Sequence, residues 1–151
     1  MSTVFCGVPS GQRAHRVPGI QDVRLPVGAG GQIAQVFALD GDLGAGKTVM
    51  TRGIARGMGL NADDVCSPTF TIVNEYDENE DGSPAQVPLF HFDTYRLGGS
   101  DDFLDAGLDE YFDRGGVCVI EWSSVIDDLL PKDNVRIKIT GSGEMRKIEV
   151  T

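Results

Sequence analysis

The feature that most constrains this chain is the eight-residue run GDLGAGKT at residues 41–48. It fits the pattern G-x-x-x-x-G-K-[ST] without a gap or a substitution. An apolar segment at residues 36–39 precedes it, and a segment with helical spacing follows it. The sequence therefore predicts a strand, a glycine-rich loop and a helix in succession, which is the context in which such a loop binds phosphate.

The chemistry of such a loop comes from its backbone and from its last two residues. Glycines let the chain curl so that successive N–H groups face one anion, and the N-terminus of the following helix adds partial positive charge. Lys47 is predicted to reach the β- and γ-phosphates, and the Thr48 hydroxyl to be a magnesium ligand. The chain is therefore expected to bind a nucleoside triphosphate with Mg²⁺.

Length and charge limit what surrounds this loop. A chain of 151 residues has the size of one domain, so residues 1–151 are expected to form a single domain without a second catalytic module. The net charge of -10 argues against a protein that grips nucleic acid by itself, because phosphate contacts need clustered Lys and Arg. No apolar run approaches the ~20 residues of a membrane span.

The three cysteines, Cys6, Cys66 and Cys118, are scattered and lack C-x-x-C spacing. They are typical of reduced thiols in a cytoplasmic protein and do not suggest a disulfide framework or a zinc site. Cys118 lies inside an apolar run and is expected in the core. Residues 1–10 lack the basic and apolar regions of a secretory signal, so we expect a cytoplasmic location.

Secondary-structure patterns in the first half of the chain vary in strength from one segment to the next. Residues 1–31 are rich in glycine and proline, with one short strand possible at residues 23–25. After the loop, Met50, Ile54 and Met58 form an apolar helical stripe that Gly59 ends. Residues 70–76 are a strand candidate, because Phe70 and Ile72 alternate with Thr71. The acidic residues 77–84 are expected to be a solvated hairpin tip rather than a metal site.

The second half alternates between strands and a helix. Buried strands are predicted at residues 89–92 and 117–120. Between them Ser100 resembles a helix N-cap, with Asp101 and Asp102 in the first turn. One helical face then follows, ended by glycine, with apolar residues Leu104, Leu108, Tyr111 and Phe112. Residues 135–139 and 147–150 predict a β-hairpin at an edge of the sheet.

Together these elements predict an α/β fold. We expect a three-layer arrangement of the P-loop NTPase type, with helices on both faces of the sheet. The sheet should be mostly parallel, with an antiparallel hairpin at the C-terminus.

Two acids stand at the ends of apolar strands, where carboxylates of such folds meet the nucleotide. Asp93 follows residues 89–92 and Glu121 follows residues 117–120. Each fits a metal ligand or a group that positions the attacking water, and each also fits a helix cap or surface ion pair. His91 alternates with two phenylalanines and is expected to be a hydrogen-bonded structural residue. Trp122 fits either the core or an aromatic platform beside a nucleotide or partner.

Two motifs that the sequence lacks limit the class of reaction that the chain could catalyse. The chain has no N-K-x-D run, so guanine selectivity is unsupported and adenine is the default. It also lacks the arginine-bearing lid with which small-molecule kinases of this fold clamp the transferred phosphate.

Four motifs in register resemble those of the TsaE family, the bacterial ATPases of tRNA threonylcarbamoyladenosine biosynthesis. They are GDLGAGKT at 41–48, SPTFT at 67–71, HFDTYRL at 91–97 and Glu121-Trp122. The resemblance covers residues 36–150. It implies an ATPase that works with a threonylcarbamoyl-transferase and the transferase's inactive paralogue, and that reaches tRNA only through that complex. The resemblance also implies that the modified nucleoside is the adenosine next to the anticodon and that the ATPase does not perform the acyl transfer.

The resemblance also implies site residues. Thr48 and Glu121 would bind Mg²⁺, Asp93 and Lys47 would be required for turnover, and residues 67–71 would form a switch-like loop that senses the γ-phosphate. The residues that would contact ATP are Asp42, Leu43, Gly44, Ala45, Gly46, Lys47, Thr48 and, beside the site, Trp122.

The chain departs from the family at two places that bear on the site, and residues 77–85 resemble a lengthened hairpin loop away from it. Residues 1–31 differ from the usual N-terminal helix, so no adenine contact is assigned. The family also places an arginine after a glycine in the final hairpin, where this chain has Gly143-Glu144, with Arg146 and Lys147 nearby. Two other functions compete with the tRNA-modification ATPase: a P-loop kinase for a small metabolite, and a nucleotide-sensing protein without useful hydrolysis.

Overall fold

A computed structural model describes residues 2–7, 35–141 and 143–151. The expected strand at residues 23–25 lies outside these residues. Within these ranges, five elements come before the turn between β3 and β4: β1 (Ser2–Gly7), β2 (Gln35–Gly41), α1 (Lys47–Gly57), the 3-10 helix η1 (Ala62–Asp64) and β3 (Val73–Glu78). Seven follow: β4 (Pro84–Asp93), α2 (Ser100–Asp105), η2 (Leu108–Asp113), β5 (Val117–Glu121), η3 (Ser123–Leu129), β6 (Val135–Thr140) and β7 (Met145–Val150).

The strands form one sheet in the order β1-β7-β6-β2-β5-β4-β3. Its four central strands, β6, β2, β5 and β4, are parallel to one another. Antiparallel strands flank them, with β3 beside β4 on one side and β7 and β1 beyond β6 on the other. The predicted α/β fold, with a mostly parallel sheet and an antiparallel C-terminal hairpin, is therefore confirmed.

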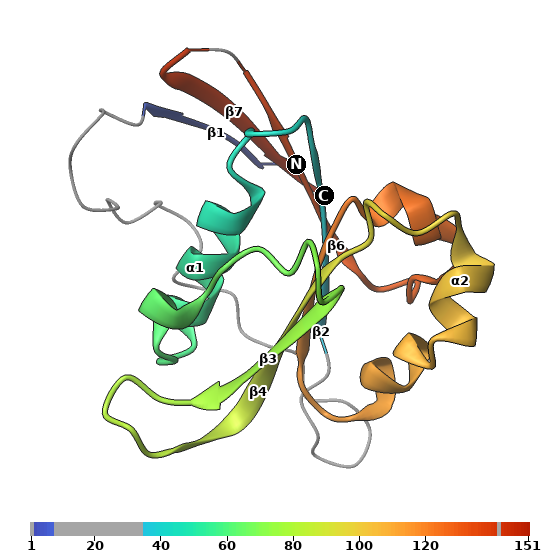
Figure 1. Ribbon diagram of the computed structural model, residues 1–151. Coiled ribbons are helices and arrows are strands. Elements are labelled where there is room, and N and C mark those ends of the chain that lie inside the picture. Colours follow the sequence, from blue (N-terminus) through green and yellow to red (C-terminus); the bar gives the residue numbers. More distant parts are fainter. Residues whose placement is uncertain (1, 8–34, 142) are drawn as a thin grey trace.

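Helices cover both faces of the sheet, which gives three layers (Figure 1). Helix α1 packs on one face over a core that includes Phe37, Leu39 and Val119. Helix α2 and the 3-10 helices η2 and η3 cover the other face, whose core includes Phe92 and Phe103. Strands β2, β5 and β4 supply alternate side chains to the two cores, as expected for strands buried on both faces.

Two glycines explain why the strand–loop–helix unit takes its shape. Gly46 has φ 110°, a left-handed conformation that only glycine adopts easily, immediately before the first turn of α1. At Gly41 a Cβ atom would lie 2.6 Å from the Ile139 carbonyl oxygen. A larger residue there would push β2 away from β6 where the phosphate-binding loop begins.

The predicted strand at residues 70–76 begins too early. Strand β3 starts at Val73, and the Phe70 side chain is 84% exposed. The Ile72 N–H donates to the Pro68 carbonyl at 2.7 Å, and Ile72 itself has φ 68°. This tight turn takes residues 68–72 out of the sheet, although their apolar alternation resembles a strand. The predicted hairpin tip after β3 is confirmed, since β3 and β4 are antiparallel partners.

The single predicted helix across residues 100–114 is wrong. It divides into α2 and η2 because Gly107 has φ 69° and interrupts the helical path. Leu104 is 42% exposed, and the neighbouring Phe103 is the buried residue instead. Ser100 is the first residue of α2 and not its N-cap, and its hydroxyl donates to Asp128.

The predicted C-terminal hairpin exists, but it does not form an edge of the sheet. Strand β7 pairs with β6 on one side and with β1 on the other, from Ser2 opposite Val150 to Gly7 opposite Met145. The N-terminal strand was not predicted, because its glycine- and proline-rich surroundings carry little periodicity.

Candidate functional site

The candidate site forms where three parallel strands end. Leu39 in β2 lies opposite Glu121 at the end of β5, and Glu121 lies opposite Asp93 at the end of β4. The loop at residues 42–46 leaves β2 at this same edge and leads into α1. Adjacent parallel strands therefore bring together the loop and both acids that the sequence singles out, at the edge where ligands of such sheets bind.

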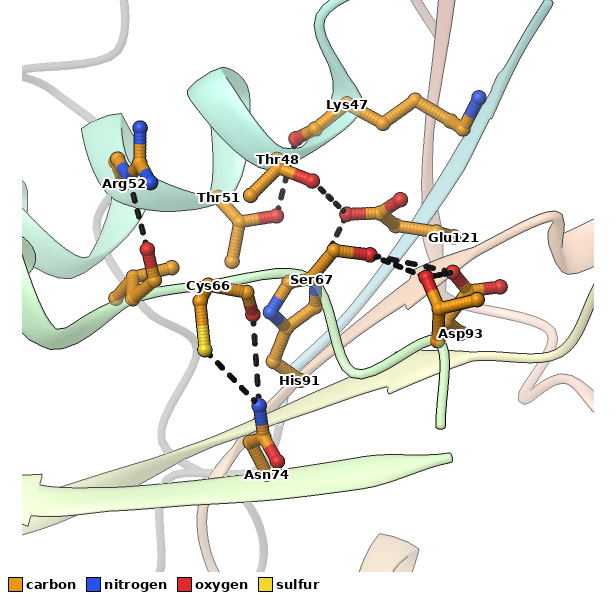
Figure 2. A network of polar contacts seen from close by, with 12 residues as sticks. Lys47, Thr48, Thr51, Arg52, Cys66, Ser67, Asn74, His91, Asp93 and Glu121 are labelled. Carbon is orange, nitrogen blue, oxygen red and sulfur yellow. Dashed lines mark hydrogen bonds and ion pairs between the residues drawn. The ribbon is translucent and has the colours of Figure 1, made fainter. Parts of the chain in front are cut away.

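Glu121 is joined to two other elements through one oxygen atom. The Thr48 hydroxyl in the first turn of α1 donates to Glu121 Oε1 at 2.9 Å. His91 Nε2 on β4 lies 2.8 Å from the same Oε1 (Figure 2). His91 is fully buried and Glu121 is only 4% exposed. The predicted pair Thr48 and Glu121 is thus in direct contact, and His91 is hydrogen-bonded as expected of a structural residue.

Lys47 lies at the start of α1 and is buried. Its ammonium group donates to the carbonyl oxygens of Gly41 at 2.6 Å and Asp42 at 3.0 Å, and lies 4.2 Å from the centre of the Trp122 ring. Burial lowers the pKa of Lys47, although the negative charges of Glu121 and of the nearby aspartates oppose this effect. A negative charge bound in the loop would offset the cost of this desolvation by its attraction to the ammonium group.

Trp122 lies beside the site, as its position after Glu121 suggests. It has φ 59°, an uncommon conformation for a bulky residue, and its N–H donates to the Leu39 carbonyl at 3.0 Å. Its ring also packs against Tyr95, with the centroids 4.9 Å apart. The turn that follows β5 therefore places an aromatic surface next to the Lys47 ammonium group.

Asp93 is 5% exposed and accepts hydrogen bonds on both oxygens. The Tyr95 N–H donates to Oδ1 at 3.0 Å. The hydroxyls of Thr69 and Ser67 donate to Oδ2 at 3.1 and 3.4 Å. The segment at residues 67–71 therefore contacts one of the two strand-end acids directly, whereas Glu121 contacts the helix.

The remaining residues of the loop differ in exposure. Asp42, Leu43 and Gly44 are exposed, Gly46 is partly exposed, and Ala45 is buried. The Ala45 carbonyl accepts a hydrogen bond from Arg146 Nε at 3.1 Å. Arg146 thus ties the final hairpin to the loop, while the neighbouring Lys147 pairs with Glu149 at 2.7 Å. Of the two cations near the end of the chain, only Arg146 reaches the loop.

Sequence reasoning missed Thr94. This buried residue follows Asp93, and its hydroxyl donates to the carbonyls of Glu121 at 3.0 Å and Trp122 at 2.8 Å. These bonds fix the backbone at Glu121. The only available indication was its place directly after Asp93 in the motif at residues 91–97.

The donors at this site suit a magnesium ion that a nucleotide brings with it. One hydroxyl and one carboxylate, from Thr48 and Glu121, are oxygen ligands of the kind that Mg²⁺ prefers beside substrate phosphates. In the described part of the chain, no three His, Cys, Asp or Glu side chains gather so as to hold a metal by themselves. In the same residues, no helix is long and apolar enough to cross a membrane.

Comparisons with known proteins agree on one family. The family described as "Threonylcarbamoyl adenosine biosynthesis protein TsaE" matches residues 21–148. Two similar proteins are named "tRNA threonylcarbamoyladenosine biosynthesis protein TsaE". The one from Bacillus subtilis is 45% identical over 109 residues, which are 72% of this chain and 63% of that protein. The one from Haemophilus influenzae is 38% identical over 112 residues, or 74% of this chain and 66% of that protein.

A solved structure shares the fold of this chain. The crystal structure of Bacillus subtilis YdiB is 38% identical and has a TM-score of 0.55, and the match covers 76% of this chain and 65% of that one. The matches to this structure and to the two named relatives each span less than two thirds of the relative's length.

Proposed function

The chain belongs to the TsaE family of threonylcarbamoyl adenosine biosynthesis proteins, and from this membership we propose that it is a Mg²⁺-dependent ATPase of tRNA threonylcarbamoyladenosine modification. The observation that carries the proposal is the contact between Thr48 and Glu121. It joins the end of the phosphate-binding loop to a strand-end carboxylate, as nucleotide hydrolysis with a metal requires.

In this proposal the backbone N–H groups of residues 42–48 hold the phosphates of ATP. Lys47 exchanges its bonds to the Gly41 and Asp42 carbonyls for the β- and γ-phosphates. Thr48 and Glu121 hold Mg²⁺, which when bound neutralises charge on the β- and γ-phosphate oxygens. Trp122 lies beside the nucleotide and in contact with the Lys47 side chain.

Asp93 is the second acid required for turnover. Its carboxylate orients the attacking water, or forms hydrogen bonds with the groups that surround the metal. Its bonds to Ser67 and Thr69 connect it to the loop that is proposed to sense the γ-phosphate. A change in that loop on nucleotide binding would therefore reach Asp93 directly, and would couple the state of the nucleotide to the attack of water.

The ATPase would serve a larger complex in the cytoplasm. We place it with the threonylcarbamoyl-transferase and its inactive paralogue, which hold the tRNA and carry out the acyl transfer. The net charge of -10 supports this assignment of RNA binding to the partners. An acidic protein is poorly suited to binding RNA phosphates directly, and is better suited to docking on proteins that hold the tRNA. The chain would act as one ATPase domain.

Deleting the gene in its own organism tests this function. The threonylcarbamoyladenosine content of bulk tRNA should fall, and a plasmid carrying the wild-type gene or the Lys132→Ala variant should restore it. Lys132 is an exposed lysine outside the site, so this control makes the same lysine-to-alanine change without altering the site. The Lys47→Ala variant should fail to restore the modification. Normal levels of the modified nucleoside in the deletion strain would contradict the proposal and would favour a kinase or a nucleotide sensor.

A further inference from the structure

His91 is buried against the site in an unusual way. It lies in β4 opposite Val119 of β5 and is fully buried. Its Nε2 lies 2.8 Å from Glu121 Oε1, whereas its Nδ1 is buried with no hydrogen-bond partner among the described residues. A side chain that served only to fill the core would avoid a buried polar atom without a partner. Among the described residues, the one polar contact of the ring is therefore the bond from Nε2 to Glu121, which explains why a histidine occupies this buried position.

The contact falls on a particular oxygen. His91 Nε2 and the Thr48 hydroxyl both approach Oε1 (Figure 2), and no bond to Oε2 occurs within the described residues. A carboxylate only accepts hydrogen bonds, so Nε2 carries the proton in this pair. Two donors on Oε1 fix the rotation of the carboxylate and leave Oε2 available as a ligand for a cation.

The two donors differ in how firmly they are held. Thr48 lies in the first turn of α1 and is itself a proposed metal ligand, so its hydroxyl changes partner when a cation binds. His91 lies in the middle of the sheet and is completely enclosed, its Nε2 is already bonded to Oε1, and it is not among the proposed metal ligands. Its bond to Oε1 is therefore the one that persists in both states.

We propose that His91 is a positioning residue that holds Glu121 Oε1 so that Oε2 is presented to the cation of the bound nucleotide. The proposal deepens the ATPase function above and rests on it. Partners of this kind that orient a ligand typically change metal affinity or activity about 10- to 100-fold when they are removed. Nucleotide binding without metal should not depend on them.

Two substitutions separate this role from a merely structural one. In His91→Gln the side-chain NH₂ group can take the place of Nε2 and still donate to Glu121. In His91→Asn the NH₂ group lies near the position of Nδ1 and cannot reach Oε1. Both variants place a neutral amide in the same buried position, so their effects on packing are similar. Val119→Ala, a buried change opposite His91, is a control for loss of packing without loss of the donor.

The measurement is the binding of Mn²⁺, as a spectroscopic substitute for Mg²⁺, to the full chain with a non-hydrolysable ATP analogue, followed by electron paramagnetic resonance. His91→Asn should weaken Mn²⁺ binding about 10- to 100-fold. His91→Gln and Val119→Ala should stay within about threefold of wild type. Affinity for the analogue in EDTA should be the same in all four proteins, and thermal unfolding would show that each is folded.

Equal Mn²⁺ affinity in His91→Asn and wild type would overturn the positioning role. So would an equal loss in His91→Asn and His91→Gln, because the donor would then not explain the effect. A wild-type protein that binds neither the analogue nor Mn²⁺ would instead contradict the ATPase function itself, which distinguishes the two failures.

Discussion

The hydroxyl of Thr48 lies 2.9 Å from Oε1 of Glu121, although 73 residues separate the two in the sequence. One residue is in the first turn of α1 and the other ends β5. Their contact places a hydroxyl and a carboxylate on the same side of the sheet as Lys47. This is the arrangement expected of a site that binds a nucleotide together with its metal.

Lys47→Ala should abolish detectable ATP binding. The ammonium group is proposed to contact two phosphates, and hydrogen bonds to charged groups each contribute about 1.5–3 kcal/mol. A loss of at least ~100-fold in affinity, measured by calorimetry, is therefore expected. Lys132→Ala should bind like wild type. Binding by Lys47→Ala within a few-fold of wild type would show that the loop does not hold the nucleotide.

Glu121→Ala should spare much of the nucleotide binding and remove metal-dependent hydrolysis. The loop would still hold the phosphates, but the proposed carboxylate ligand would be missing. A fall in kcat of about 10²- to 10³-fold is expected for losing a group that stabilises developing charge. Phosphate release at saturating ATP, over a series of Mg²⁺ concentrations, would measure it. Equal hydrolysis by wild type and variant would exclude the metal assignment.

Asp93→Asn should retain ATP binding and lower kcat about 100-fold, because a group that orients or deprotonates water contributes about 10²- to 10⁴-fold. Ser67→Ala and Thr69→Ala each remove only one donor to Asp93, so their effects should be smaller. Single-turnover hydrolysis would separate these effects from product release. Normal turnover by Asp93→Asn would show that this carboxylate is structural.

Arg146→Ala should weaken ATP binding roughly 3- to 10-fold, since the loop loses one hydrogen bond at the Ala45 carbonyl. The guanidinium also donates to the carbonyls of Gly143 and Met145 at 2.7 and 2.9 Å, so it links the hairpin turn to the loop. Arg136→Ala removes another arginine of the same hairpin, one that pairs with Asp127, and should bind ATP normally. The same affinity in both variants would rule out a role for Arg146 in the loop.

Stability at high pH should depend on Cys118, which is 1% exposed. Burial raises the pKa of its thiol from 9.0 to about 12. The neutral thiol is thus favoured in the fold, and its contribution is fully present below pH 9 and lost as the pH rises toward 12. The free energy of unfolding should fall by about 1.4 kcal/mol per pH unit through this window.

Cys118→Ala provides the control for this dependence, because it lacks the thiol at every pH. The difference in unfolding free energy between wild type and Cys118→Ala, from urea denaturation at pH 8 and pH 10.5, should shrink at the higher pH. A constant difference would mean that the thiol ionises as easily in the fold as in the unfolded chain.

Local patterns predicted the parts of the fold that local chemistry determines. The loop at residues 41–48, the buried strand ending at Glu121 and the C-terminal hairpin each follow from spacing along the chain. The two acids could also be identified from the sequence, because each stands at the end of a predicted parallel strand. The carboxyl ends of such strands meet at one edge of the sheet.

The errors arose where tertiary contacts or turns override such patterns. Phe70 alternates like a strand residue, but the turn at Ile72 removes it from the sheet. A regular apolar spacing suggested one helix, but Gly107 divides it. The contacts of Arg146 with the loop and of Thr94 with Glu121 join elements distant in sequence, and no spacing rule predicts such pairs. The pairing of β1 with β7 spans nearly the whole chain.

The most direct test is ATP hydrolysis by the purified protein, alone and with the threonylcarbamoyl-transferase and its inactive paralogue from the same organism. Hydrolysis that requires Mg²⁺, is stimulated by the two partners and is lost in Glu121→Ala is the predicted result. It would establish the chain as the ATPase of that complex. Binding of ATP without any stimulation, together with unchanged tRNA modification when the protein is omitted, would contradict this function and leave only a nucleotide-binding loop.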